Sequence, residues 1–307
     1  MKIGINGNRL VASGDVHAIT KHAADVAAAG VGSYWLAQHP AGAMDALGTL
    51  IAVAGRQPQL ALGTGVIPIW GRHPAALAAQ VLTASQSVPG GLTVGIGLSH
   101  VAMVEQHLGT LYARPLATMR EYLEVLVPLV RDGEVDHEGP IFQCHTKVAV
   151  AGPPTDVLVA AMGPRMLELA GALADGTIVT WTGPKTIRDH VIPTISKAAA
   201  DHGRPPPRIA AVFSACVTDD ADAARAAVHD WFEFHGRAPS YDAMLEREGV
   251  ASASDVALIG DESEVAARIL DLAALGVTDL IIGEAVPGDA RTRRLLADVM
   301  TTTDVSP

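Results

Sequence analysis

The sequence has few cysteines, few aromatic residues and a deficit of basic charge. Only two of its 307 residues are cysteines, Cys144 and Cys216, and they stand far apart without the spacing of a zinc cluster. We therefore expect two free thiols, as in a reducing compartment, and no disulfide framework. The chain has 22 Lys and Arg against 33 Asp and Glu, a net charge of −11. This sign argues against a nucleic-acid partner, because phosphate backbones are bound by cationic surfaces.

Long hydrophobic runs are also missing. Gly, Pro or charged residues interrupt every apolar stretch before the roughly 20 residues that a membrane-spanning helix needs. The first residues, Met1 to Ile5, have the pattern of a strand and not of a signal peptide. We expect a soluble, cytoplasmic protein without a membrane partner. What the chain does have is 49% hydrophobic residues, enough for a sizeable core.

Runs that are typical of β-strands alternate along the chain with longer Ala- and Leu-rich stretches of helical periodicity. Such alternation predicts parallel strands joined by helices. The eight candidate strands are Lys2 to Asn6, Ser33 to Ala37, Leu60 to Ile67, Leu92 to Gly97, Val157 to Ala161, Thr177 to Trp181, Ile209 to Val217 and Thr278 to Gly283. Eight βα units favour a closed barrel over an open sheet. We therefore predict an α/β protein of one domain, residues 1–307, folded as a (β/α)8 TIM barrel.

Helix ends and two insertions can be recognised as well. The helix signals are Asp15 before and Gly30 after the first helix, Pro74 and Pro115 at first-turn positions, and Glu262 to Leu275 leading into Gly276. Two segments exceed a minimal barrel, and we expect them to be short insertions on the loop face. Asp132 to Pro154 has room for a hairpin, and Arg237 to Ser254 is an extra polar helical segment before the eighth strand.

Residues that directly follow the strands should converge on one face of such a barrel and form the functional site. Those of interest are Asn6, Gln38, His39, Gly65, Val66, Pro68, Leu98, Ser99, His100, Met162, Gly163, Trp181 and Glu284. The set is apolar and rich in amides, with few charges. It suits a flat, polar-edged aromatic ring better than hydrolysis, which needs paired carboxylates, a metal or an activated nucleophile.

Other interpretations of these strand ends are weaker. Ser99 and His100 are neighbours that would point to opposite faces of a strand, and no G-x-S-x-G elbow surrounds them. Gly95-Ile96-Gly97 contains two glycines of a dinucleotide fingerprint without the third. These glycines fit ligand contact and close backbone approach equally well.

Three further groups suggest chemistry. Ala161 to Arg165 leads into a helix start whose free amides, with the Arg165 charge, could bind phosphate, although many helix starts bind nothing. His39 is the sharpest candidate for proton transfer because imidazole titrates near neutrality, with a purely structural histidine as the alternative. The cluster Asp136 to Glu138 with Cys144 and His145 lacks metal-ligand spacing, so we expect a solvated loop and no metal.

Several segments together resemble the luciferase-like monooxygenase superfamily, especially its branch that uses the deazaflavin coenzyme F420. The resemblance spans nearly the whole chain. It rests on Gly30 to His39, on Gly65-Val66 with Arg72-His73-Pro74, on Gly95 to Leu98 with Arg114-Pro115 and Met119 to Leu123, and on Ala160 to Leu167 continuing to Gly176.

The resemblance implies a deazaflavin or flavin ring in the barrel mouth, braced by a bulge or cis peptide at Gly65-Val66. It implies proton transfer by His39. The predicted cofactor contacts are Asn6, Gln38, Gly65, Val66, Leu98, Ser99, His100 and the phosphate loop Ala161, Met162, Gly163, Pro164 and Arg165. The predicted substrate pocket contains Trp35, Pro68, Trp181 and Glu284. Members of the superfamily commonly dimerise, so we expect a homodimer.

The sequence departs from the F420-dependent sugar-phosphate and alcohol dehydrogenases. Gln38 replaces their aspartate before the histidine, and their glutamate near His100 is missing. Reduction of an unsaturated or imine-like bond is therefore at least as plausible as alcohol oxidation. The leading hypothesis is hydride transfer between C5 of coenzyme F420 and a small organic substrate. The alternatives are an FMN-dependent monooxygenase or reductase of the same fold, and a non-catalytic cofactor-binding barrel.

Overall fold

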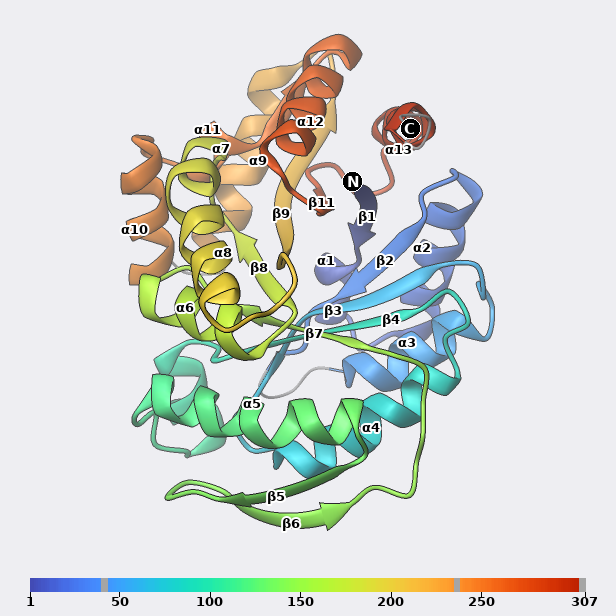
Figure 1. Cartoon of the computed structure of the whole chain (residues 1–307). Coiled ribbons are helices and arrows are strands. Elements are labelled where there is room, and N and C mark those ends of the chain that lie inside the picture. Colours follow the sequence, from blue (N-terminus) through green and yellow to red (C-terminus); the bar gives the residue numbers. More distant parts are fainter. Residues whose placement is uncertain (40–43, 235–237, 304–307) are drawn as a thin grey trace.

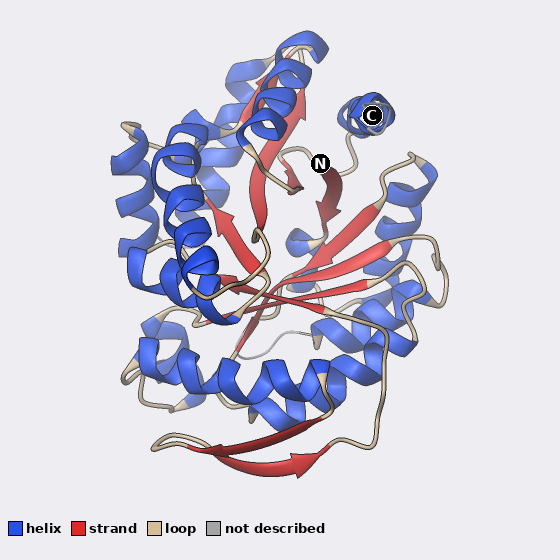
Figure 2. Ribbon diagram, in the orientation of Figure 1, coloured by secondary structure: helices blue, strands red, loops and turns tan. Residues whose placement is uncertain are grey.

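The computed structural model describes residues 1–39, 44–234 and 238–303. Within these residues, eight parallel strands pair in the order β9-β11-β1-β2-β3-β4-β7-β8, and β8 pairs back to β9 to close a barrel. The strands are β1 Lys2–Asn6, β2 Ser33–Leu36, β3 Ala61–Pro68, β4 Leu92–Gly97, β7 Asp156–Ala160, β8 Gly176–Thr180, β9 Arg208–Val217 and β11 Asp279–Glu284. Helices surround them on the outside (Figures 1 and 2). The predicted TIM barrel is confirmed.

Helices follow the barrel strands along the chain. The longer ones are α2 Val16–Ala28, α3 Ala46–Ala54, α4 Pro74–Gln86, α5 Pro115–Arg131, α6 Pro164–Leu173, α8 Ile192–Asp201, α9 Ala221–Phe234, α12 Glu262–Leu275 and α13 Ala290–Thr303. Short helical turns are α1 Asn8–Val11, α7 Pro184–Thr186 and the π-turns η1 Met103–His107 and η2 Ile187–Val191. Their ends confirm the sequence signals. The Asp15 carboxylate accepts from His17 N and Ala18 N, and Gly276 ends α12 at φ 104°.

The first insertion is a hairpin of β5 Glu134–Glu138 and β6 Gln143–Lys147, as predicted. It is inserted between α5 and β7 and not after a barrel strand, which corrects our expectation of an insertion on the loop face, and it lies along the outside of α5 (Figure 1). The buried carboxylate of Glu121 in α5 accepts from Ile141 N at 2.8 Å and Phe142 N at 2.9 Å. The tip of the hairpin is therefore fixed to the middle of α5.

The second insertion is helical, as expected, although Arg237 itself lies outside the described residues. It consists of α10 Pro239–Glu248 and the turn α11 Ala253–Val256. A three-residue strand that we did not predict follows, β10 Leu258–Gly260. It pairs with β9 through Leu258 and Ala215, beyond the point where β8 ends. Three residues are too few to show a period, so the sequence pattern misses this strand.

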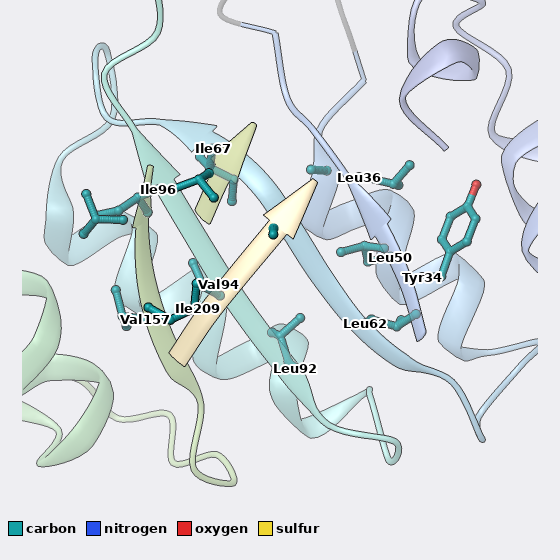
Figure 3. Packing of buried hydrophobic residues seen from close by; sticks show 14 of the residues in the cluster. Tyr34, Leu36, Leu50, Leu62, Ile67, Leu92, Val94, Ile96, Val157 and Ile209 are labelled. Carbon is teal, nitrogen blue, oxygen red and sulfur yellow. The ribbon is translucent and has the colours of Figure 1, made fainter. Parts of the chain in front are cut away.

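Side chains of the barrel strands divide between two cores. Leu36, Ile67, Val94 and Val157 belong to the large cluster between strands and helices (Figure 3). Inside the barrel, Trp35 packs with Leu158, Ile178, Ala210 and Ile281. No helix among residues 1–39, 44–234 and 238–303 is long and apolar enough to cross a membrane.

Trp35, which we predicted for the substrate pocket, lies buried inside the barrel beneath Gly65. Its side chain is 4% exposed, and the indole N–H donates to Ser33 Oγ at 3.2 Å. The ring lies against Gly63, where an added Cβ would stand 2.3 Å from Trp35 Cε3. A side chain at Gly63 would fill the space that the indole occupies, so the glycine admits the large ring.

Candidate active site

The floor of the mouth is formed by a break in β3. The Gly65–Val66 peptide is cis, and the pairing register between β3 and β4 shifts between Thr64 and Ile67. The expected bulge or cis peptide is therefore present. Gly65 and Val66 are partly exposed, whereas Thr64 and Ile67 on either side are fully buried. The backbone at this break faces the mouth.

Gly95 and Gly97 of β4 make room for this break. A Cβ on Gly97 would lie 2.7 Å from Val66 Cγ2, and one on Gly95 would lie 2.3 Å from the carbonyl oxygen of Thr64. The two glycines are thus explained by close approach of β3, which was one of the two interpretations. Pro68, predicted for the substrate pocket, is buried at the end of β3 opposite Gly97.

Amide side chains hold the loop after β2. Asn8 Oδ1 accepts from Ala37 N at 2.7 Å, and Asn6 Oδ1 accepts from Asn8 N at 3.2 Å. Gln38 Oε1 accepts from Ala46 N at 3.2 Å, and Gln38 N donates to Val66 O at 3.0 Å. Gln38 therefore ties the loop to the start of α3 and to the cis peptide. These bonds position the next residue, His39, beside the floor of the mouth.

His39 and His100 come together from the ends of β2 and β4. Burial, and second the charge of His39, lower the pKa of His100 below its ordinary value. His100 Nε2 lies 3.4 Å from the Tyr241 hydroxyl, and the two rings make an edge contact at 5.4 Å between centroids. Burial raises the pKa of Tyr241 to about 12. The Tyr241 hydroxyl is thus protonated near neutral pH and lies within hydrogen-bond reach of His100 Nε2.

Tyr241 is a site residue that the sequence did not reveal. It lies in α10, which we recognised only as a polar insertion. An aromatic residue in an otherwise polar helix is the one signal in the sequence that could have pointed to it. Glu248 at the other end of α10 accepts from Lys185 N at 3.1 Å and Thr186 N at 2.7 Å. These two bonds attach α10 to α7 and hold Tyr241 over the mouth.

Ser99 and Trp181, after β4 and β8, have left-handed backbones with φ of 56° and 53°. Such conformations cost about 1–3 kcal/mol in non-glycine residues and cluster at functional sites. The Trp181 ring packs edge-on against Phe232 of α9 at 5.1 Å. Leu98, Ser99 and Trp181 are partly exposed. They lie at strand ends where the cofactor and pocket contacts were predicted.

The predicted phosphate loop divides into two parts. Gly163 is the N-cap of α6, Pro164 follows it, and a Cβ on Gly163 would meet nothing within 4 Å. The loop is held from behind, since Ala161 is bonded to Thr177 Oγ1 and Met162 O lies 2.8 Å from His190 Nε2. This part presents an open helix start, as predicted.

Arg165, in contrast, is placed differently from our prediction. It lines an outer cavity of about 510 Å³ between α5, α6 and α8, together with Arg120, Glu168 and Asp201. Glu168 and Leu169 follow Arg165 by three and four residues on the same helix face. Because that face is turned towards α5 and α8, the guanidinium lies on the outer surface of the barrel.

Glu284 is not a pocket residue either. Its side chain is 4% exposed, and its carboxylate accepts from Arg293 Nε at 2.6 Å and from Gly288 N at 3.2 Å. His22 Nε2 of α2 lies 2.9 Å from the same carboxylate. Burial opposes its ionisation, but bonds from His22, Arg293 and Gly288 outweigh burial and lower the Glu284 pKa to about 2. Glu284 joins β11 to α2 and α13 behind the barrel.

In the part of the chain that the structure describes, no group of three or more His, Cys, Asp or Glu side chains is arranged so that it could bind a metal ion. In the exposed hairpin, His145 bonds to Asp136 and to Glu138, the latter at 2.9 Å.

Comparison with known proteins identifies relatives along nearly the whole chain. The family model of the luciferase-like monooxygenases matches residues 3–279. The chain is 26% identical to 5,10-methylenetetrahydromethanopterin reductase of Methanolobus tindarius, over 91% of this chain and 94% of that protein. It is 25% identical to F420-dependent glucose-6-phosphate dehydrogenase of Kineococcus radiotolerans, over 87% and 86%. The solved coenzyme F420 dependent tetrahydromethanopterin reductase from Methanopyrus kandleri superposes with a TM-score of 0.83 at 21% identity, covering 98% of this chain and 99% of that one.

Proposed function

Because this chain belongs to the luciferase-like monooxygenase family, we propose that it transfers a hydride between the deazaflavin coenzyme F420 and a small organic substrate. The chain is an oxidoreductase, and several proteins similar to it are named for their dependence on coenzyme F420. The choice of F420 is supported by the F420-dependent dehydrogenase that matches 87% of this chain. The observation that carries the proposal is the partly exposed break in β3 at Gly65 and Val66, to which the bond from Gln38 N to Val66 O ties the residue before His39.

The residues present at the mouth fit a ring with an anionic tail. At Gly65 an added Cβ would meet only Trp35 Cε3, at 3.9 Å, so the peptide there is open on the mouth side for a flat ring to lie on. The open start of α6 at Gly163 offers backbone N–H groups for a phosphate. Gly65, Val66 and Leu98 would hold the ring, and Gly163 with its neighbours the phosphate. When bound, the deazaflavin supplies or accepts a hydride at its C5.

His39 is the proton-transfer group in this proposal. Its ring is partly exposed at the mouth, and its position is fixed by the bonds of Gln38 to Val66 O and Ala46 N. His100 stays neutral near pH 7 because burial and the His39 charge disfavour its protonation. His39 can then carry a proton without a second imidazolium beside it, and deliver that proton to the substrate atom that becomes basic on reduction.

Reduction is the favoured direction. Gln38 stands where the F420-dependent sugar-phosphate and alcohol dehydrogenases often have an aspartate. Its side-chain oxygen already accepts a hydrogen bond from Ala46 N. An amide cannot accept the proton that leaves an alcohol during oxidation. A relative matching 91% of this chain is named as a reductase. The substrate class proposed is therefore a small molecule with an imine-like or conjugated double bond.

The test is an anaerobic screen of such compounds with chemically reduced F420, following the return of the oxidised coenzyme's absorbance. We expect at least one compound to reoxidise the coenzyme with a dependence on enzyme concentration. Deuterium at C5 of the reduced coenzyme should then appear in the product. Turnover that requires oxygen, or that proceeds with reduced FMN and not with reduced F420, would contradict the proposal and favour a flavin monooxygenase.

A further inference from the structure

Three buried polar side-chain atoms have no hydrogen-bond partner in the described residues: Arg72 Nη1, Tyr122 Oη and His137 Nε2. They lie in one region, where the loop after β3, helix α5 and the hairpin tip meet. The charge of Arg72 acts on Tyr122. His137 Nε2 stands 3.8 Å from Glu121 Oε2, whose carboxylate holds the hairpin tip. Buried polar groups are nearly always satisfied, so this concentration indicates a missing partner.

A cavity of about 410 Å³ opens beside one of these residues, Arg72. Its wall includes Trp70, Arg72, His73, Arg114, Ile141 and Phe142. Phe142 connects the cavity to the buried group, because its ring lies 5.8 Å from that of Tyr122 and 5.6 Å from that of His73. A volume of this size is within the usual range for small-molecule sites, which are mostly apolar with a few placed polar groups.

The charges around the cavity favour an anion. Arg72 uses Nη2 to bond Asp45 at 3.0 Å, which leaves Nη1 available. Arg114 lines the cavity and forms no ion pair with the residues that the structure describes. The carboxylate of Glu121, which does not line the cavity, accepts from Ile141 N and Phe142 N. The cavity is therefore lined by one guanidinium with an unpartnered N–H, that of Arg72, and by a second, that of Arg114, without an ion pair among the described residues.

We propose that this cavity is a second ligand site, which binds a small organic anion with a carboxylate or phosphate on an apolar body. The anionic group contacts Arg72 and Arg114, and the apolar body lies against Trp70 and Phe142. The aromatic wall is extended by Tyr112, whose ring packs on Trp70 at 5.0 Å. The site is separate from the mouth but tied to it, since Trp70 Nε1 donates to Leu98 O at 2.6 Å.

The test uses the full chain without any coenzyme, so that its result does not depend on the cofactor proposal. Calorimetric titrations compare phenyl phosphate, inorganic phosphate and benzyl alcohol in a phosphate-free buffer. We expect saturable binding of phenyl phosphate with quenching of Trp70 fluorescence, weaker binding of inorganic phosphate, and none of the neutral alcohol. A Trp70→Phe variant should lose the fluorescence change and keep the heat of binding. Failure of phenyl phosphate to bind would overturn the proposal.

Matched variants locate the site. Arg114→Gln should weaken phenyl phosphate binding about tenfold, the typical loss of one charged hydrogen bond. Arg120→Gln removes the same charge from the same helix at the other cavity, and should leave the affinity unchanged. Tyr122→Phe removes an unsatisfied hydroxyl. It should preserve or raise the melting temperature of the free protein. Equal effects of Arg114→Gln and Arg120→Gln, or unchanged affinity in Arg114→Gln, would contradict the assigned location.

Discussion

His39 and His100 are close enough for the charge of one to lower the pKa of the other. This coupling gives the two imidazoles different roles in our proposal, with His100 neutral and His39 free to exchange a proton. Tyr241 supports the arrangement because its hydroxyl lies 3.4 Å from His100 Nε2. The titratable side chains that the structure brings together here are therefore two histidines and a tyrosine, whereas Glu284 is bonded to His22 and Arg293.

Replacing His39 tests this assignment. His39→Asn should lower kcat with F420 by about 100-fold or more, the usual contribution of general acid catalysis. Affinity for the coenzyme should change little, because His39 acts on the substrate. The measurement is steady-state turnover beside a coenzyme titration. His17→Asn, in the exposed first turn of α2, is the control and should behave as wild type. Undiminished turnover of His39→Asn would remove His39 from the mechanism.

Glu284 serves stability instead of chemistry. Glu284→Ala leaves Arg293 buried without its partner and should lower the free energy of unfolding by about 3–5 kcal/mol. Glu262→Ala breaks the exposed pair of Glu262 with Arg291 and should have a much smaller effect. Chemical denaturation measures both. Equal losses in the two variants would show that burial of Glu284 is misjudged.

The same carboxylate predicts a pH dependence. Its pKa falls from about 4.3 in the unfolded chain to about 2 in the folded one. The lowered pKa stabilises the fold above about pH 5, and this contribution disappears as the pH falls towards 2. Glu284→Gln cannot ionise, so the stability difference between wild type and this variant should shrink over that range. A difference that is constant with pH would contradict the lowered pKa.

At the scale of elements, close packing of helices α6 and α8 depends on Gly171. A Cβ there would stand 2.4 Å from Ile195 O and 2.9 Å from Ala198 Cβ. Gly171→Ala must push the two helices apart and should cost about 1–3 kcal/mol of stability. Gly55→Ala is the control, because its nearest atoms lie at 3.7 Å and its φ of −62° suits alanine. If denaturant titrations gave Gly171→Ala the same free energy of unfolding as wild type, the two helices would not be in close contact at Gly171.

Elements were predictable from the sequence where local chemistry defines them. Asp15, Pro74 and Gly276 mark helix ends because caps act through neighbouring backbone groups. Strands were found from their apolar runs. The short strand β10 and the residue Tyr241 were not, because their roles depend on contacts with distant elements.

Side-chain direction was the main source of error. Alternation along β11 places Ile281 inside the barrel and Glu284, three residues on, outside. Counting from Ile281 would therefore have excluded Glu284 from the pocket. We predicted the wrong position for the Arg165 side chain because we treated the residue as part of the loop. Arg165 lies in the first turn of α6, after Pro164, and the helix directs its side chain towards the outer cavity.

At the scale of the whole molecule, closure of the barrel makes the strands interdependent. The β8–β9 pairing joins the two ends of the sheet, so each barrel strand in the described residues has a neighbour on both sides. We predict that the chain unfolds as one domain in a single transition. Circular dichroism and tryptophan fluorescence should give coincident curves. Trp35 lies inside the barrel and Trp231 in α9, so two separated transitions would indicate independent parts.

The central claim is that the mouth is built for a deazaflavin. The most direct measurement is an equilibrium fluorescence titration of the purified protein with coenzyme F420, run beside FMN at identical salt and pH. We predict saturable micromolar binding of F420 and much weaker binding of FMN. Preference for FMN would move the chain to the flavin-dependent members of its family, and binding of neither would contradict the cofactor site itself.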